Sequence, residues 1–454
     1  MMSAKNEKST FYKIFFYFPL ILGGIFILTL IAHYGVNTPF WDQWDMVALF
    51  QKASHHSLGF ADLWHQHNEH RIFFPLLVLL ANAYLTHWNT FIEMFISAFF
   101  ALVTAVLLFS LIKRSIQTYW LGICAALIVS VWFFSPVQWQ NWLWGGQVAW
   151  FMTNLGAIAA LFLITKGADA KTERTRHLLF LFAGLTAFIS TFSLASGLFS
   201  WIAGLILLIL NKEKKKILEI WSLAGLISIG LYYYHLSQTP TPSGSASQFF
   251  IHHPLGFIKF FIALLGGPVG SFSGGGLQTA LPGSLQLPLV VGGILLAALV
   301  PVAVLIWYRR NNIRAYAPWL ALIIYSLLCI LSTAYGRLGY GIDLVYKSRY
   351  TAFSLLYVIG LVVLAIMLLN ESRLKKYAKV VWVGSLMALM LPIMISSYAV
   401  GFHGFSSQSQ LLKQTKACTH ANPPTQDCLF QTYPKPWIVS PRLEYVKDRH
   451  WAGY

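Results

Sequence analysis

Residues 91–112 read FIEMFISAFFALVTAVLLFSLI, and Lys113 and Arg114 follow them directly. The stretch contains one charged residue, Glu93, near its start. A helix rises about 1.5 Å per residue, so about 20 apolar residues cross the roughly 30 Å hydrocarbon core of a bilayer. The stretch therefore predicts a membrane-spanning helix that ends at a basic boundary.

The same pattern recurs along the whole chain of 454 residues. Hydrophobic residues make up 57% of it and charged residues only 10%, whereas soluble domains carry about 25% charged residues. We therefore predict an all-α polytopic transmembrane protein with about eleven spanning helices. Two short spans are expected within 177–210, separated by the small-residue segment 190–197. The other nine are expected at 13–33, 91–112, 118–134, 148–165, 217–236, 287–308, 315–334, 351–369 and 380–400.

The basic residues set the expected topology. The formal net charge is +17, and most of the 32 lysines and arginines fall in six clusters between apolar runs, at 5–13, 113–114, 166–176, 212–216, 309–314 and 373–379. Cytoplasmic loops of membrane proteins carry this excess, so we expect the six clusters inside. Dispersed charge of this kind is unlike the contiguous basic face of a nucleic-acid-binding protein, so no nucleic acid is expected as a partner.

With the basic loops inside, the other loops lie outside. We expect a transmembrane domain over 1–400, with an external loop at 34–90, and a small external C-terminal tail over 401–454. The first span lacks a convincing cleavage site and is expected to be an uncleaved anchor. The region 237–288 stays outside by parity, so its apolar piece at 257–265 is expected to be interfacial or re-entrant.

The first external loop gathers acidic residues. It holds four of the chain's 15 Asp and Glu, including Asp42 and Asp45 in the motif Trp41-Asp42-Gln43-Trp44-Asp45. Residues three apart share one side of a helical turn, and two nearby carboxylates can divide the roles of base and orienting group. The alternative is that one Asp caps a helix expected at 46–52, while Trp41 and Trp44 anchor the loop at the membrane interface.

A second segment of this loop is rich in histidine. It contains His67, Glu69, His70 and Arg71. These side chains could ligate a metal, contact a substrate or phosphate, or belong to a solvated loop, and the sequence leaves all three open. The apolar run at 72–85 is too short to span a bilayer and is expected to form a helix at the membrane surface.

Two further external loops carry candidate binding residues. The loop 135–147 interleaves three tryptophans, Trp142 among them, with Gln and Asn. Sugars bind such surfaces by stacking and hydrogen bonding, although an aromatic belt explains the tryptophans equally well. The loop 335–350 places Arg337, Lys347 and Arg349 outside. This positive charge opposes the topology rule and suits a phosphate; snorkelling to lipid headgroups is the alternative.

The four cysteines divide into two kinds. Cys124 and Cys329 lie in apolar spans, where a buried thiol is expected. Cys418 and Cys428 lie in the external tail with nine residues between them. Outside the cytoplasm such a pair can oxidise, and we predict a Cys418–Cys428 disulfide. A zinc site is the weaker interpretation, because only His420 lies near.

These features resemble the GT-C superfamily of integral membrane glycosyltransferases. The resemblance rests on one inside-to-outside helix, an acidic first external loop with surface helices, and many further spans. The segments 193–197 and 336–350 also look like those of uncharacterised bacterial members. The acidic motif is Asp-Gln-Trp-Asp, where the mannosyltransferases of the superfamily have an adjacent acidic pair.

The resemblance implies a GT-C-like fold with interfacial helices in the first external loop, and an inverting transfer of a sugar from a polyprenyl-phosphate carrier. The acceptor would be a periplasmic or extracellular glycan or lipid, used in making cell-envelope polysaccharide. The protein would lie in a bacterial inner membrane, surrounded by its lipids. The N-terminus would be cytoplasmic and the C-terminus periplasmic. No protein-bound metal or cofactor is expected, although a divalent cation stays possible.

The resemblance also implies roles for individual residues. Asp42 or Asp45 would be the general base, and Arg337 and Arg349 would stabilise the leaving phosphate. The remaining substrate-binding residues would be Trp41, Trp44, His67, Glu69, His70, Arg71, Trp142, Lys347 and Tyr350. The alternative function is a polysaccharide or lipid transporter or flippase. Ion-coupled carriers place charges within their spans, whereas Glu93, Glu219 and Lys259 lie near span ends here.

Overall fold

The predicted spans form long helices. A computed structural model describes residues 2–237, 246–269, 273–274, 279–280 and 285–454. Within these ranges, nine helical segments are long and apolar enough to cross a membrane. Each overlaps one of the nine single spans predicted above, so the all-α polytopic class is confirmed. Their main helices are α1 (Met2–Tyr34), α5 (Thr90–Ser115), α6 (Tyr119–Phe133), α8 (Val148–Ala168), α11 (Lys215–Tyr233), α14 (Gln286–Tyr308), α15 (Ile313–Arg337), α16 (Thr351–Asn370) and α17 (Lys376–His420).

The segment predicted to hold two short spans forms α9 (Glu173–Thr191) and α10 (Phe199–Leu210). The 3-10 turn η4 (Ala195–Leu198) separates them, as the small residues predicted. A Cβ at Gly197 would lie 1.9 Å from the carbonyl oxygen of Ser190, so only glycine fits this turn. Neither helix is among the nine, because α9 begins with a charged turn and α10 is short. By length and composition the number of spans among the described residues is therefore nine rather than eleven.

Short helices fill the loops that are predicted to be external, which keep the name external loops below. The first loop contains η1 (Trp41–Asp45), α2 (Met46–Ser54), α3 (Phe60–Trp64) and α4 (Phe73–Thr86). The second contains η2 (Pro136–Gln138), α7 (Trp139–Leu143) and η3 (Gly145–Gln147), and the third η7 (Leu338–Tyr340), η8 (Ile342–Tyr346) and η9 (Ser348–Tyr350). The C-terminus ends in α18 (Gln426–Thr432) and α19 (Pro436–Asp448). The helices predicted at 46–52 and 72–85 are thus confirmed as α2 and α4.

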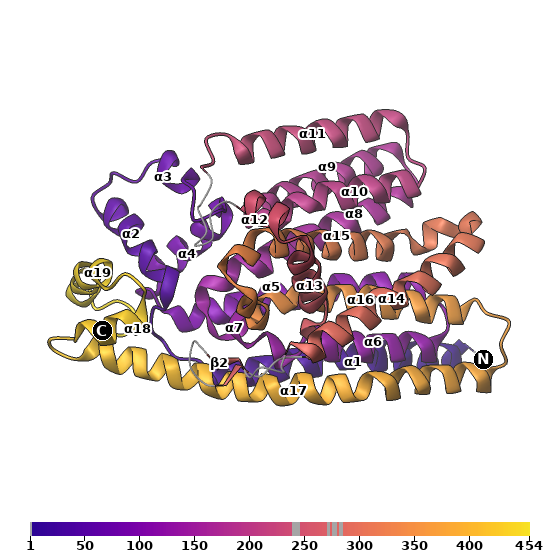
Figure 1. Cartoon of the computed structure of the whole chain (residues 1–454). Helices are drawn as coiled ribbons and strands as arrows, with labels where there is room; N and C mark the ends of the chain where they lie inside the picture. The colour runs from indigo at the N-terminus through magenta and orange to yellow at the C-terminus, as the bar shows by residue number, and fades with distance from the viewer. Residues whose placement is uncertain (1, 238–245, 270–272, 275–278, 281–284) are drawn as a thin grey trace.

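The apolar piece predicted at 257–265 forms α13 (Pro254–Leu265), which follows α12 (Ala246–His252) and precedes η5 (Gly267–Val269). It packs on α14 and α15 and runs across the long helices (Figure 1). Its length of 12 residues is too short to span a bilayer. A two-stranded ribbon, β1 (Ser273–Gly274) and β2 (Thr279–Ala280), follows. Much of the glycine-rich run named above lies outside the described residues.

The basic loops lie together at one end of the bundle. Figure 1 shows the connections α5–α6, α8–α9, α10–α11 and α16–α17 at the right-hand end, and α14–α15 meet there through η6 (Arg310–Asn312). Ion pairs join these loops: Arg114 Nη2 lies 2.5 Å from Asp169 Oδ2, and Lys214 Nζ lies 3.0 Å from Glu173 Oε1. The external loops and the C-terminal helices occupy the opposite end. The structure thus segregates the loops as the charge pattern predicted.

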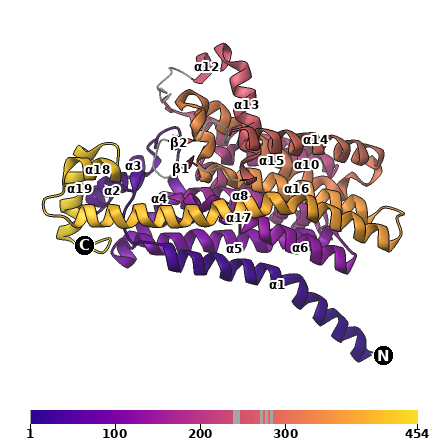
Figure 2. The same ribbon diagram turned by 60° about the horizontal axis from the view of Figure 1, so that its bottom comes forward.

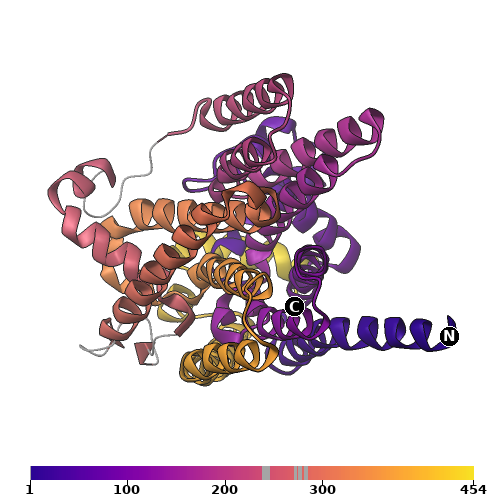
Figure 3. The same ribbon diagram turned by 90° about the vertical axis from the view of Figure 1, so that its right-hand side faces the viewer.

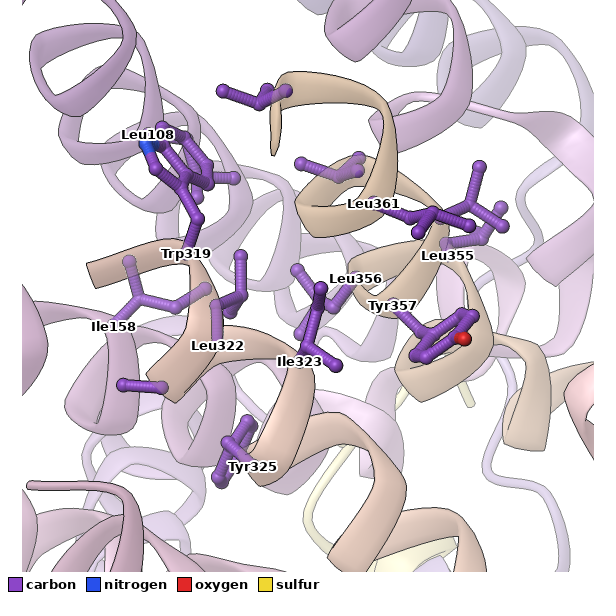
Figure 4. Close-up of a cluster of buried hydrophobic side chains, with 14 of the residues drawn as sticks. Leu108, Ile158, Trp319, Leu322, Ile323, Tyr325, Leu355, Leu356, Tyr357 and Leu361 are labelled. Carbon is purple, nitrogen blue, oxygen red and sulfur yellow. The ribbon is translucent and has the colours of Figure 1, made fainter. Parts of the chain in front are cut away.

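The core lies between the long helices. Trp319, Tyr325, Leu356 and Tyr357 are at most 2% exposed. Figure 4 shows Leu108 of α5 beside Trp319, Ile158 of α8 beside Leu322, and Ile323 of α15 facing Leu356 of α16. The N-terminal part of α1 projects from this bundle (Figures 2 and 3).

The helix α17 is much longer than a span. Its 45 residues extend about 68 Å, so the span predicted at 380–400 is only part of it. The helix continues through Gly401 and Gly404, because at both positions it packs closely against neighbouring elements. A Cβ at Gly401 would lie 2.5 Å from the backbone of Pro136, and one at Gly404 would lie 2.1 Å from Cδ1 of Trp139. The part of α17 after Val400, here called its outer part, therefore packs directly against the second external loop.

Candidate active site

The three external loops meet around one cavity of about 840 Å³. Its walls come from η1, the His-rich segment, α7 and the start of α8, the third external loop, and the outer part of α17. Nine residues predicted as site residues line it: Trp41, Asp42, His67, Glu69, His70, Arg337, Lys347, Arg349 and Tyr350. Four others do not line it: Trp44, Asp45, Arg71 and Trp142.

Hydrogen bonds hold η1 against the outer end of α5. The amide Nε2 of Gln43 donates to Glu93 Oε2 at 2.6 Å, and its Oε1 accepts from the backbone N–H of Phe40 at 3.1 Å. Trp44 is fully buried against Trp88. Gln43 and Trp44 thereby anchor the turn, and Asp42 faces the cavity.

Asp42 is paired with a histidine. Its Oδ2 lies 3.8 Å from His67 Nε2. Burial works to raise the pKa of Asp42, but the ion pair with His67, together with the charges of Arg349 and Arg337, outweighs burial and holds the pKa below its ordinary value. In His67 burial works to lower the pKa, and Asp42 outweighs it, so the pKa of His67 is raised. Asp42 is therefore ionised at neutral pH.

Asp45 has a different setting. Its Oδ1 lies 2.6 Å from Arg442 Nη1, and its Oδ2 accepts a hydrogen bond from the Tyr433 hydroxyl at 2.9 Å. Burial, with the charge of Asp45, raises the pKa of Tyr433. Asp45 occupies the N-cap position of α2 but makes no capping hydrogen bond. Its carboxylate therefore ties η1 to the C-terminal helices α18 and α19.

The C-terminal helices are themselves fastened to α17. Cys418 near the end of α17 and Cys428 in α18 are joined by a disulfide, with Cα atoms 5.7 Å apart. The carbonyl of Trp44 accepts a second hydrogen bond from Arg442, at 2.8 Å. The tail therefore packs on the loop that carries Asp42.

The His-rich segment forms a small backbone turn. The N–H of His67 donates to the carbonyl of His70 at 2.8 Å, and the reverse bond is 2.9 Å. Burial lowers the pKa of His70 to about 3, so this imidazole is neutral. Glu69 pairs with Arg337 and lies 3.3 Å from His70 Nε2. Within the described ranges, three or more His, Cys, Asp or Glu nowhere gather closely enough to hold a metal ion.

Arg71 and Trp142, predicted to bind substrate, are packed into the protein. Arg71 is 4% exposed and donates to the carbonyls of Tyr232, Tyr234 and Trp64, which fixes the loop on the end of α11. Trp142 is fully buried, and its Nε1 donates to the carbonyl of Ser135 at 3.2 Å. Sequence spacing could not separate these buried members from the cavity-lining ones.

Arg337, Lys347 and Arg349, here called the cationic wall, line the cavity beside Asp42. The guanidinium of Arg349 lies 5.7 Å from the ring centre of Trp144 and 5.1 Å from that of Tyr350. Arginine presents a fork of donors that matches phosphate, so the cationic wall is suited to an anion.

The second external loop braces the third. Asn141 Nδ2 donates to the carbonyl of Arg349 at 3.0 Å, and the N–H of Gln140 donates to Ser348 Oγ at 3.0 Å. These bonds join residues more than 200 positions apart. Trp139, Gln140, Trp144, Gln147 and Trp150 also line the cavity but were not predicted individually.

One wall was missed by sequence reasoning. It consists of His403, Ser407, Gln410 and Gln414 on α17, here called the α17 face. Their spacing of four, three and four residues places them on one side of a helix. The signal was present in the sequence, but the segment was assigned to the external tail.

Comparison with known proteins finds likenesses among solved structures. No family model and no curated protein matches this chain. Among solved structures, it is similar to the oligosaccharyltransferase of Archaeoglobus fulgidus, determined in complex with zinc and sulfate, with 15% sequence identity and a TM-score of 0.43. The match covers 84% of this chain and 53% of that one, so this chain spans about half of its length. The likeness assigns no role to any residue described above.

Proposed function

We propose that this chain is a membrane glycosyltransferase that moves a sugar from a polyprenyl-phosphate carrier to an acceptor, with inversion. One observation carries the proposal: an ionised carboxylate, Asp42, and the cationic wall line the same cavity. Transfer from a lipid phosphate needs a proton acceptor on one side of the reacting carbon and an anion-stabilising group on the other.

The reaction is a single displacement. The acceptor hydroxyl donates a hydrogen bond to Asp42 and attacks the anomeric carbon as the bond from that carbon to the phosphate oxygen breaks. The electron pair leaves with the phosphate, and Arg349, Arg337 and Lys347 stabilise the added charge. Because the pKa of Asp42 is low, it takes the proton only as the new bond forms and the hydroxyl becomes acidic.

Asp42 is preferred to Asp45 as the base. Asp42 lines the cavity, whereas both oxygens of Asp45 are bonded to Arg442 and Tyr433. Asp45 would then act on the site by holding η1 in place.

The proposed location is a bacterial inner membrane, with the N-terminus cytoplasmic and the C-terminus periplasmic. The clustered basic loops support this orientation. The Cys418–Cys428 disulfide at the opposite end also supports it, because such bonds are rare in the cytosol.

The experiment is sugar transfer by the purified chain from short polyprenyl-phosphate donors, with and without a chelator. Asp42→Asn is expected to lower turnover about 10²- to 10⁴-fold, the typical contribution of a general base. Asp62→Asn is the matched control, because Asp62 lies in the same loop, outside the cavity, and pairs with Lys52. Full activity of Asp42→Asn rules out the mechanism. Movement of intact donor across the membrane without cleavage supports a flippase instead.

A further inference from the structure

We infer that the α17 face is the acceptor subsite, and that the acceptor is an uncharged glycan rich in hydroxyl groups. This inference rests on the proposed function. It concerns a part of the cavity that the phosphate donor and Asp42 do not use.

The first support is the set of polar groups that α17 offers to the cavity. His403, Gln410 and Gln414 are exposed, and Ser407 is half-buried. Gln410 and Gln414 make no hydrogen bond to any residue that the structure describes. Each side-chain amide offers both donors and an acceptor, so the α17 face can donate hydrogen bonds to hydroxyl groups and accept hydrogen bonds from them.

The second support is a buried amide in the same wall. Gln408 lines the cavity and is 4% exposed, and its Nε2 has no partner in the described part of the chain. In the second external loop, Trp144 and Gln147 also line the cavity, and Trp144 Nε1 and Gln147 Oε1 have no hydrogen-bond partner among the described residues. Buried polar groups are normally satisfied. A sugar hydroxyl donates and accepts, so it can complement both kinds of group.

The third support is the distribution of charge. The residues of α17 that line the cavity include no Asp, Glu, Lys or Arg, because Lys413 and Lys416 of this helix do not line it. The cavity's Lys and Arg side chains all come from the third external loop. An anionic acceptor would compete with the donor phosphate for the cationic wall. The arrangement therefore favours a neutral acceptor on α17.

Trp139 supplies a flat surface beside the α17 face. It is half-buried and lines the cavity. It lies against α17 because Gly404 has no side chain, since a Cβ there would overlap the indole. Indole faces stack on the C–H faces of sugar rings, and the neighbouring amides would then engage the hydroxyls.

The test measures binding of uncharged oligosaccharides (glucans, mannans, galactans and arabinans) and of uronic-acid polymers to the full chain in nanodiscs. The double variant Gln410→Ala/Gln414→Ala is expected to bind the preferred neutral oligosaccharide about 10-fold or more weakly, through loss of two amide contacts. Gln431→Ala is the matched control, because Gln431 is exposed on α18 and does not line the cavity. In turnover, the KM for acceptor is expected to rise while the KM for donor stays within about twofold.

Unchanged affinity in the double variant overturns the inference. Preference of the wild type for the uronic-acid polymers, or binding of no oligosaccharide at all, overturns it too. Binding is measured without catalysis, so these outcomes are separate from failure of donor cleavage, which would instead refute the proposed glycosyl transfer.

Discussion

Asp42 and Asp45 show how neighbouring residues of one type acquire different roles. They are three residues apart in the same 3-10 turn, yet only Asp42 lines the cavity. Asp45 pairs with Arg442, which is 397 positions away in the chain. Local spacing predicted a functional role for both carboxylates but could not distinguish them, because Arg442, which pairs with Asp45, is distant in sequence.

The pairing of Asp42 with His67 predicts a change in pH dependence. His67→Ala removes the ion pair that opposes the effect of burial on the pKa of Asp42. The pKa of Asp42 then rises, so its carboxylate is protonated at higher pH. The acid limb of the kcat/KM profile is expected to move to higher pH, and less so in His67→Gln, which keeps a hydrogen-bond donor.

The control for this prediction is His65→Ala, since His65 is exposed in the same loop and does not line the cavity. An acid limb that is the same in wild type and His67→Ala would mean that Asp42 is not the group titrating in the profile.

Glu93 is expected to be structurally important. It is fully buried and accepts hydrogen bonds from Gln43 in η1 and Asn82 in α4. Gly145 leaves room for it, because a Cβ there would lie 2.4 Å from Glu93 Oε2. Glu93→Ala leaves the buried Gln43 Nε2 without its acceptor, at about 1–3 kcal/mol, and removes one of the two hydrogen bonds of Asn82 Nδ2, which still donates to the carbonyl of Asn89. We expect a lower Tm in detergent, with a smaller loss for Glu93→Gln, which keeps one acceptor oxygen.

Glu219→Ala serves as the comparison for Glu93→Ala, because the Glu219 side chain is 61% exposed. Equal Tm values for the Glu93 and Glu219 variants would contradict the role of Glu93 as the link between η1, α4 and α5.

At the scale of elements, the contact of α17 with the second external loop is set by glycine. In Gly404→Ala, the added methyl group would meet Trp139 at 2.1 Å, so helix or indole must shift. We expect impaired acceptor use and a lower Tm. Gly384→Ala lies on the same helix with nothing within 4 Å of the added Cβ, and should behave as wild type or slightly better, because alanine favours helix. Similar effects of the two substitutions on acceptor KM would refute the close contact.

The elements themselves were largely predictable, because lipid imposes a length and an apolar composition on each span. The predicted spans at 118–134 and 351–369 differ from α6 and α16 by a residue or less at each end. The continuation of α17 beyond Val400 was not predicted. There the apolar run ends while the helix continues, stabilised by packing against Pro136 and Trp139, which hydropathy does not record.

At the scale of the whole molecule, charge predicted which loops share an end, but not that they share a cavity. That convergence depends on contacts such as Asn141 with Arg349 and Glu69 with Arg337, which join distant parts of the chain. Parity placed all of these residues on one face. Their side-chain packing depends on tertiary contacts that a single sequence does not reveal.

The proposed orientation predicts the accessibility of introduced thiols. Ser57 in the first external loop and Lys171 in a basic loop are both exposed. Ser57→Cys should react with a membrane-impermeant maleimide in intact spheroplasts, and Lys171→Cys only after permeabilisation. The parent chain is the control and measures the background from its two free thiols, Cys124, which is half-buried, and Cys329, which is buried; Cys418 and Cys428 are joined. The opposite labelling pattern would show that the basic loops lie outside, contrary to the proposed orientation.

The length of α17 has a mechanical consequence. One rod of 45 residues both crosses the bilayer and forms a wall of the cavity. A bilayer whose thickness differs from the apolar length of a helix is accommodated by tilting that helix. A tilt of about 5° displaces a point about 35 Å along a rigid rod by about 3 Å, roughly the length of a hydrogen bond. Hydrophobic mismatch would thereby change the distance between the α17 face and Asp42, and the proposed glycosyl transfer is expected to depend on the acyl-chain length of the surrounding lipids.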